Sequence, residues 1–366
     1  MNLARKFFWS IKLHSLLQER VDISENEAWS ILNAFLPSRC VAPSFSQHVE
    51  YLPQVDLMIV IPVYNVAPFL EQCILSILNQ KTNFSYVAVF VDDGSTDGSG
   101  EILEKYKDRD TIVIIHQENY GLSRARNTGL KKIFGEYVCF LDSDDFLAED
   151  AIEILMNSAR KNDADIVEGS HYLYYLNGER KLIAHTEMQG AFAKEELFGY
   201  AWGKVIRSSF FCNLCFPDGY LFEDTIMGTI LYPECERIVT LPDPFWYYRQ
   251  NLLGITQTAG KKKETIDTFW LTKYCIEEAD RRGLLTAEWY LPRFYNKMRL
   301  NYLRLREMPF DIKQSIFLLS CELYKQYFAH AAKNEKGKYK WLKKILDNRS
   351  YAAYEYLMQR WTVIDE

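Results

Sequence analysis

The sequence lacks the signatures of several large classes of protein. It contains neither the GxxxxGK motif of P-loops nor GxGxxG, so ATP hydrolysis and dinucleotide binding have little support. No apolar run approaches the ~18 uncharged residues that a membrane-spanning helix needs, and residues 1–6 do not begin a typical secretory signal. The net charge of −6 argues against a general nucleic-acid binder. We therefore expect a cytoplasmic protein with no nucleic-acid partner.

Metal-binding patterns built on cysteine or histidine are also missing. The eight cysteines are scattered, and the single CxxC, Cys212 to Cys215, has no second pair at a zinc-like spacing. Its aromatic neighbours, among them Phe211 and Phe216, favour packing of these thiols in the core. The six histidines form no cluster. A histidine-based metal site therefore has no support in the sequence.

The pattern that is present is typical of an α/β enzyme. With 366 residues, 48% of them hydrophobic, the chain can bury a full α/β core and carry a smaller subdomain. Apolar runs predict strands at 57–61, 87–91, 111–115 and 137–141. Amphipathic helices are expected between them, at 65–78, around 102–106 and at 122–133. Such βα repeats imply a mostly parallel sheet, which binds ligands at the carboxyl ends of its strands.

Two acidic clusters follow predicted strands. Asp92 and Asp93 end the second strand, and residues 142–145, Asp-Ser-Asp-Asp, follow the fourth. Like charges this close raise one another's pKa unless a cation or hydrogen-bond donors compensate, which indicates a divalent-metal site at 142–145. A solvated acidic turn that caps a helix starting near Glu149 is the alternative.

Four motifs, in this order, resemble those of the family 2 glycosyltransferases of the GT-A fold. They are IPVYN at 61–65, VDDGSTD at 91–97, NYGLSRARNTG at 119–129 and GEYVCFLDSDD at 135–145. The resemblance is dense from about 57 to 150 and looser from 165 to 255, where WGKV at 202–205 and FED at 222–224 match acceptor-side elements.

Three segments are expected along the chain, the middle one from the resemblance and the other two from their apolar periodicity. Residues 55–260 would form the GT-A domain, a Rossmann-like, mostly parallel sheet flanked by helices. Residues 1–54 would be a helical N-terminal extension, and residues 261–366 a helical C-terminal subdomain. Residues 1–54 and residues 261–366 lie outside the resemblance.

The resemblance implies a nucleotide-sugar donor. Asp93 would accept the N3–H of uracil, while Pro62 and Tyr64 would line the same pocket. A carboxylate pairs with an imide N–H, which uracil and thymine offer and cytosine lacks. Asp93 therefore favours UDP- or dTDP-sugars over CDP-sugars and does not separate the first two.

The resemblance also implies a bound Mn²⁺ or Mg²⁺. Asp144 would be the metal ligand, and Asp142 would touch the metal, a metal-bound water or the ribose. Such an ion completes its shell with waters and substrate phosphates, so few protein ligands suffice. Asp145 would pair with a cation such as Arg126, and either Arg124 or Arg126 would approach the diphosphate.

Asp224 is the catalytic base that the resemblance implies. A carboxylate in a partly apolar setting has a raised proton affinity, and Asp224 would deprotonate the acceptor hydroxyl that attacks the donor's anomeric carbon. One in-line displacement inverts the anomeric configuration. The alternative is that residues 223–224 simply begin an exposed helix through Leu231. Lys204 would contact a phosphate or the acceptor, and Trp202 would stack on a sugar or fill the core.

Three further segments carry expectations. Residues 172–184 predict a hairpin with a type I′ turn at Asn177-Gly178, beside the acceptor entrance. The lysine-rich stretch from Lys333 to Lys344, with Tyr339 and Trp341, could rest on an anionic membrane or form a solvated face. The N-terminal segment is a second membrane candidate, with Leu3, Phe7, Ile11, His14 and Leu17 on one face, or it docks on its own domain.

These observations predict a metal-dependent, inverting glycosyltransferase that uses a UDP-sugar and acts on a glycan or lipid-linked glycan in cell-surface polysaccharide synthesis. It would be cytoplasmic, with a peripheral contact at the inner face of the cell membrane if either candidate segment binds lipid. A non-catalytic sugar-nucleotide or glycan-binding protein on the same fold is the alternative. A sugar-phosphate nucleotidyltransferase fits less well, because the first predicted strand leads into Pro62 and Val63 and not into a glycine- and arginine-rich loop.

Overall fold

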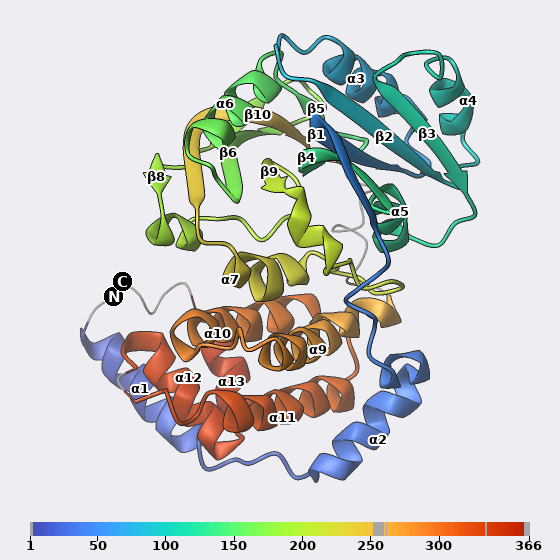
Figure 1. Cartoon of the computed structure of the whole chain (residues 1–366). Helices are drawn as coiled ribbons and strands as arrows, with labels where there is room; N and C mark the ends of the chain where they lie inside the picture. The colour runs from blue at the N-terminus through green and yellow to red at the C-terminus, as the bar shows by residue number, and fades with distance from the viewer. Residues whose placement is uncertain (1–2, 252–259, 261, 334, 362–366) are drawn as a thin grey trace. The chain divides into compact units, whose positions relative to one another are not determined.

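A computed structural model describes residues 3–251, 260, 262–333 and 335–361 (Figure 1). The chain forms two compact units. Residues 43–254 make the first, called the sheet unit, and residues 1–42 with 255–366 make the second, called the helical unit. The N-terminal helices therefore group with the C-terminal ones. The division into segments 1–54, 55–260 and 261–366 stays a prediction.

The sheet unit is built on a ten-stranded sheet. Eight of the strands follow the order β3-β2-β1-β4-β9-β6-β10-β5, and the other two, β7 and β8, pair with β6 and β10. Strands β1, β2, β3, β4, β6 and β10 run in one direction, and β9 runs against its neighbours β4 and β6. The predicted α/β class and mostly parallel sheet are confirmed. The strands are β1 Glu50–Val63, β2 Tyr86–Asp93, β3 Ile112–Gln117, β4 Lys132–Phe140, β5 Phe146–Leu147, β6 Ile166–Tyr174, β7 Arg180–Ile183, β8 Met188–Gln189, β9 Lys204–Arg207 and β10 Ile238–Arg249.

Helices cover the strands where the apolar periodicity predicts them. In α3, Leu70, Cys73, Ile74 and Ile77 are buried against the sheet. The helix expected at 122–133 is shorter, because α5 ends at Gly129 and the chain enters β4 at Lys132. The helices and helical turns are α3 Ala67–Leu78, α4 Ser99–Glu104, α5 Leu122–Gly129, α6 Ala151–Lys161, η2 Ala191–Glu195, η3 Ser208–Cys212, η4 Met227–Leu231 and α7 Tyr232–Glu234.

The hairpin between β6 and β7 forms as predicted, but its turn type was predicted wrongly. The Gly178 N–H donates to the Tyr175 carbonyl, and Gly178 has φ +86°. Among the described residues, Asn177 is not one of the non-glycine residues that have a positive φ. A type I′ turn needs positive φ at both central residues, so this loop has another geometry.

The helical unit joins both ends of the chain. The Arg39 guanidinium forms a buried ion pair with Asp267, with Nε 2.6 Å from Oδ1, and the Tyr274 hydroxyl donates to the Arg39 carbonyl. The elements are α1 Leu3–Leu16, α2 Glu25–Phe35, η1 Pro37–Cys40, η6 Lys263–Ile266, α9 Asp267–Arg281, α10 Ala287–Arg304, α11 Phe310–Tyr327, α12 Gly337–Asn348 and α13 Tyr351–Met358. None of the described helices is long and apolar enough to cross a membrane.

Both candidate membrane segments pack within this unit. Trp341 of α12 contacts the rings of Trp9 and His14 in α1 edge-on, and the Ser350 hydroxyl donates to the Leu16 carbonyl. Helix α1 buries Leu13 and Leu16, and Leu17 after it is buried as well, whereas Ile11 of the predicted face is 51% exposed. These contacts agree with docking of α1 on the chain itself, and a membrane contact of the remaining face stays a prediction.

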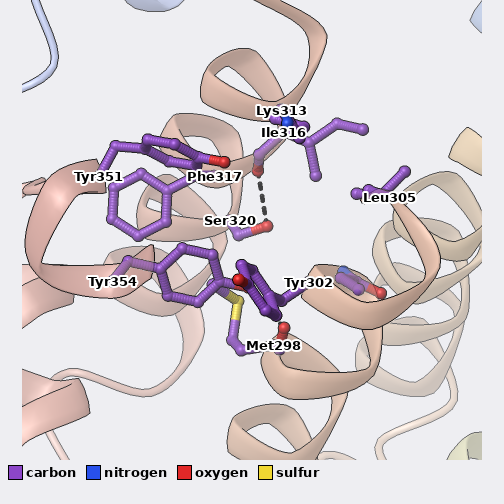
Figure 2. A pocket seen from close by; sticks show the side chains of 10 residues that line it. Met298, Tyr302, Leu305, Lys313, Ile316, Phe317, Ser320, Tyr351 and Tyr354 are labelled. Atoms are coloured by element: carbon purple, nitrogen blue, oxygen red, sulfur yellow. Dashed lines mark hydrogen bonds between the residues drawn. The ribbon is translucent and has the colours of Figure 1, made fainter. Parts of the chain in front are cut away.

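A small cavity lies among α10, α11 and α13 (Figure 2). Its walls carry four aromatic rings, those of Tyr302, Phe317, Tyr351 and Tyr354. The cavity volume is about 20 Å³, which is room for about one water molecule. The cavity is therefore a gap in the packing of the helices and not a ligand site.

Candidate active site

The predicted site residues of the sheet unit gather where strands end. Asp93 ends β2, Tyr64 follows β1, and residues 142–145 follow β4. Because β2, β1 and β4 are adjacent and parallel, these ends lie along one edge of the sheet. Pro62 lies inside β1 opposite Val91 and is buried, whereas Tyr64 is 50% exposed. Of these two predicted pocket residues, Tyr64 is the exposed one.

Asp93 is held by three donors and keeps one acceptor position. Its Oδ1 accepts hydrogen bonds from Gln117 Nε2 at 2.6 Å and from the Tyr120 N–H at 3.0 Å. Its Oδ2 accepts one from the Gly121 N–H at 2.8 Å. Each carboxylate oxygen has two lone pairs, so one position on Oδ2 is open to a further donor.

The loops after β1 and β2 are tied together by short polar side chains. Asn65 has φ +49°, and its side-chain oxygen accepts from the Thr96 N–H at 2.8 Å. Asp92 and Asp97 accept from the backbone of Ser95 and Ser99 within the same loop. These are the local turn bonds that the sequence favours for Asp92 and Asp97. Asp93 makes none of these local turn bonds, so its carboxylate remains available to the site.

The three aspartates after β4 lie in different surroundings. Asp145 is fully buried and accepts from Trp246 Nε1 and from the Arg249 N–H, both at 2.8 Å. Burial, together with Asp144 and Asp142, raises the pKa of Asp145 well above its usual range. The predicted pairing of Asp145 with Arg126 is therefore wrong. Asp145 anchors the loop to β10.

Asp144 is a carboxylate with little compensation. Burial raises its pKa, and Asp142 raises it further. Its side-chain partner among the described residues is Asn251, whose Nδ2 lies 3.3 Å from Oδ2. None of the aspartates in this loop caps the following helix, which begins at Ala151. The capping alternative is thus excluded.

The acidic loop at 142–145 offers few side-chain ligands to a metal ion. Within the described ranges, no three His, Cys, Asp or Glu side chains come together as a metal-binding group. Asp144 and Asp142 alone supply hard oxygen ligands, which suits an ion that takes its other ligands from water and phosphate. The donor set fits a divalent cation carried with a diphosphate and does not fit an all-protein cage.

Arg126 connects Asp142 to Glu223. Its Nη2 lies 2.8 Å from Asp142 Oδ1, and its Nη1 lies 2.5 Å from Glu223 Oε1, although these carboxylates are 81 positions apart in sequence. The side chain of Arg126 is 3% exposed, against 28% for Asp142 and 13% for Glu223. Arg124 is 47% exposed and pairs with Asp218. Of the two arginines, Arg126 therefore lies in the site.

Glu223 and Asp224 follow a constrained turn. Phe222 has φ +65°, which a bulky residue adopts rarely and which recurs at functional sites. The chain then enters a helix that widens to π geometry in η4. Burial raises the pKa of Glu223, and the charge of Asp224 acts in the same direction. Glu223 and Asp224 are both partly buried, and Glu223 pairs with Arg126, which differs from the alternative of a plain exposed helix start.

Lys204 does not have the surroundings expected for a phosphate contact. It is fully buried and forms an ion pair with Glu168. Its ammonium also donates to the Phe198 carbonyl at 2.8 Å and to the Tyr232 hydroxyl at 2.7 Å. Three donors thus meet three acceptors, and burial lowers the pKa of Lys204. In this arrangement Lys204 is a structural cation of the core.

Trp202 and Arg249 support the site from behind. Trp202 is 7% exposed and stacks on Tyr248 and Trp246, which favours the core alternative for this ring. Arg249 donates from Nε to the Asp144 carbonyl at 2.6 Å, and its guanidinium lies 4.7 Å from the Phe69 ring centre. The sequence does not single out Arg249, because an arginine in an aromatic run carries no local sign of its partner.

Comparison with known proteins decides the family. Residues 58–214 match Glycosyl transferase family 2. Glycosyltransferase GlyG of Streptococcus pneumoniae serotype 4 is 31% identical over 221 residues, which cover 55% of this chain and 73% of GlyG. The chain belongs to glycosyltransferase family 2. The family predicted from the four motifs is thereby confirmed.

Two further comparisons show how far the likeness extends. GlyA of the same organism is 34% identical over 211 residues, which cover 53% of this chain and 30% of GlyA, so the chain spans less than a third of that relative. The crystal structure of S. aureus TarS 1–349 in complex with UDP-GlcNAc superimposes with a TM-score of 0.64 at 19% identity, over 83% of this chain and 92% of that one. This likeness extends the shared fold across most of the family 2 chain described here.

Proposed function

We propose that this chain transfers a sugar from a UDP-sugar to a hydroxyl group of a glycan or lipid-linked glycan, with inversion at the anomeric carbon and with Mn²⁺ or Mg²⁺. The observation that carries the proposal is the set of carboxylates in three different states at one edge of the sheet. Asp93 keeps one open acceptor position, Asp144 is partly buried with Asn251 as its side-chain partner, and Glu223 next to Asp224 is paired with Arg126. Donor recognition, cation binding and proton transfer need three such states.

The roles follow from these states. Asp93 accepts the N3–H of the base, and Asp144 with Asp142 holds the metal. When bound, the metal supplies positive charge for the leaving diphosphate. Asp224 takes the proton of the acceptor hydroxyl while its oxygen forms the new bond to the anomeric carbon and the bond to the diphosphate breaks. Arg126 orients both Asp142 and Glu223. It thereby holds Glu223, the neighbour of the base Asp224, against the carboxylate on the donor side, Asp142.

Support for a UDP-sugar comes from two sources. The open position on Asp93 Oδ2 suits an imide N–H, and TarS, which shares the fold, was crystallised with UDP and with UDP-GlcNAc. The acceptor and the pathway rest on the family alone. A contact with the inner face of the membrane would be electrostatic, because Trp341 and Tyr339 of α12 have ring partners within the helical unit.

A hydrolysis screen tests the proposal. The full chain is incubated with UDP- and dTDP-sugars in Mn²⁺, in Mg²⁺ and in EDTA, and released nucleotide is measured. We expect turnover of at least one UDP-sugar in metal and little in EDTA, and Asp144→Asn should reduce UDP affinity in Mn²⁺ to the value seen in EDTA. Tight UDP binding without turnover of any donor would favour the non-catalytic alternative. Equal turnover in metal and in EDTA would show that the reaction does not need Mn²⁺ or Mg²⁺.

A further inference from the structure

Helix α5 connects the nucleotide end of the site to the segment that carries the proposed base. Its N-cap is Gly121, whose N–H donates to Asp93 Oδ2 at 2.8 Å. The helix has eight residues and is therefore roughly 12 Å long at 1.5 Å per residue. Farther along it, Arg126 reaches Glu223, the neighbour of Asp224. One short helix thus contacts both sides of the site.

The residue after Arg126 is a buried amide with a partner for each of its donors. Asn127 is 3% exposed. Its Nδ2 donates to the Phe216 carbonyl and to Asp218 Oδ1, both at 2.8 Å, and its Oδ1 accepts from the Phe216 N–H at 2.9 Å. A side-chain amide has two N–H donors and one carbonyl oxygen, so both kinds of group are used. Asn127 thereby holds both polar groups of the Phe216 backbone.

The segment held in this way leads directly to the base. Residues 213–224 lie between η3 and η4, outside any helix or strand, so side-chain contacts help to fix their path. Phe216 is fully buried, and its ring packs edge-on against Phe140 of β4 at 5.2 Å. The Arg126 guanidinium lies 5.3 Å from the centre of the same ring. The proposed base follows this anchored residue by eight positions.

The pairing needs an amide at position 127. Aspartate there could still accept from the Phe216 N–H, but its second oxygen would face the Phe216 carbonyl and the Asp218 carboxylate, which are both acceptors. Buried acceptors without a donor are unfavourable. At the other end of α5, backbone N–H groups hold Asp93, and a side-chain change leaves them in place. A substitution of Asn127 should therefore act on one side of the site.

We propose that Asn127 is a positioning residue, which fixes the segment leading to Glu223 and Asp224 and so places the base against the acceptor hydroxyl. This inference rests on the proposed function, since it assigns a further residue to the same reaction. Asn127 touches no reacting atom and acts through Asp224. A displacement of about 1 Å in a catalytic group can cost on the order of 10²-fold in rate. The amide therefore serves turnover and not donor binding.

The test compares turnover with UDP affinity in the full chain. UDP binding in Mn²⁺ is measured by calorimetry, and turnover is measured as hydrolysis of the UDP-sugar that wild type cleaves fastest, with water as the acceptor. Asn127→Asp should reduce turnover by a factor on the order of 10² and leave the UDP dissociation constant within about twofold. Asn301→Asp is the matched control, because Asn301 is a buried amide of the helical unit that is also 3% exposed. It should hydrolyse the donor like wild type.

A double-mutant cycle separates positioning from a general loss of packing. If Asn127 acts through the base, Asn127→Asp combined with Asp224→Asn should be no slower than Asp224→Asn alone. A structural defect would instead add its own loss.

A second variant acts on the same contact from the exposed side. Asp218→Ala removes one partner of Asn127 at a side chain that is 38% exposed, so it should fold, lower turnover by about 10-fold and leave UDP binding unchanged. Arg124→Ala removes only the half-exposed ion pair of Asp218 and should keep its turnover.

Wild-type turnover in Asn127→Asp would overturn the assignment, and so would a loss of UDP affinity as large as the loss of turnover. A further loss in the double variant would show that Asn127 does not act through Asp224. If Asn127→Asp does not fold, wild-type turnover in Asp218→Ala overturns the assignment in its place. If wild type binds UDP but hydrolyses no donor, the proposed function fails and the assignment with it. That result is distinguishable, because wild type is active in every other case.

Discussion

Arg126 and Lys204 are two buried cations of the sheet unit with opposite relations to solvent. Arg126 joins two carboxylates that are still 28% and 13% exposed, so a ligand can reach them. Lys204 and its partner Glu168 are 0% and 1% exposed. Both carry the same charge, and from the sequence we expect Lys204 to contact a phosphate or the acceptor and either Arg124 or Arg126 to approach the diphosphate. Only the exposure of their partners separates a cation that can respond to a ligand from one that completes a core.

The largest effect is expected from breaking the Lys204 pair. Lys204→Met leaves the Glu168 carboxylate buried without its cation, which should lower the free energy of unfolding by about 3–5 kcal/mol. Urea denaturation measures the change. Glu168→Gln combined with Lys204→Met should recover most of the loss, because His185 and the Phe198 N–H keep an acceptor. A loss below about 1 kcal/mol in the single variant would contradict a core role.

Arg126→Lys should act on transfer. An ammonium replaces the forked guanidinium that spans Asp142 and Glu223, so we expect the rate of transfer to fall by a factor on the order of 10² in a folded protein. Arg124→Lys is the matched control, because Arg124 is half exposed and pairs with Asp218. Equal rates in the two variants would show that the bridge does not contribute.

The region around Lys204 should also respond to acid. Burial lowers the pKa of His171 to about 4, so the unfolded chain binds the extra proton below its pKa of about 6.5 and stability falls as pH drops from 6.5 toward 4. Between pH 7 and 5 this group alone removes roughly 2 kcal/mol. His171→Gln should flatten that part of the profile, measured by urea denaturation at each pH.

His116 provides a control of opposite sign. Hydrogen bonds to Asp92 and Glu104 raise its pKa, so its contribution is present below the unfolded pKa and lost as pH rises. His116→Gln should therefore steepen the acid loss and not flatten it. The same profile in both variants would contradict the assignment of the acid response to His171.

The smallest effect on folding is expected from the lysines of α12. Changing Lys338, Lys340, Lys343 and Lys344 to Gln should alter stability by less than about 0.5 kcal/mol. If these lysines contact an anionic bilayer, vesicle binding should weaken as the Debye length shrinks from ~10 Å at 0.1 M salt to ~3 Å at 1 M. The quadruple variant should lose this salt dependence in a flotation assay.

A matched control for charge comes from the sheet unit. Lys105, Lys107, Lys131 and Lys132 are exposed and carry the same total charge. Their replacement by Gln should leave vesicle binding intact. Equal loss in both quadruple variants would assign the effect to net charge and not to α12.

The comparison also explains what the sequence could and could not predict. Local patterns placed β1 to β4 and the buried face of α3, because apolar runs and helical periodicity are properties of neighbouring residues. The four motifs identified the family. The partners of the cations escaped prediction, because Arg126 meets Glu223 from 97 positions away and Lys204 meets Glu168 across two strands. The stack of Trp202 on Tyr248 is likewise assembled from segments that only the sheet brings together.

The central claim is that Asp224 acts on the acceptor while the other carboxylates serve the donor. Transfer and UDP affinity should therefore be measured side by side in Asp224→Asn, in the same buffer with Mn²⁺. The account predicts a UDP dissociation constant like that of wild type, with transfer reduced by a factor on the order of 10² or more. Near-wild-type transfer by the folded variant would contradict it.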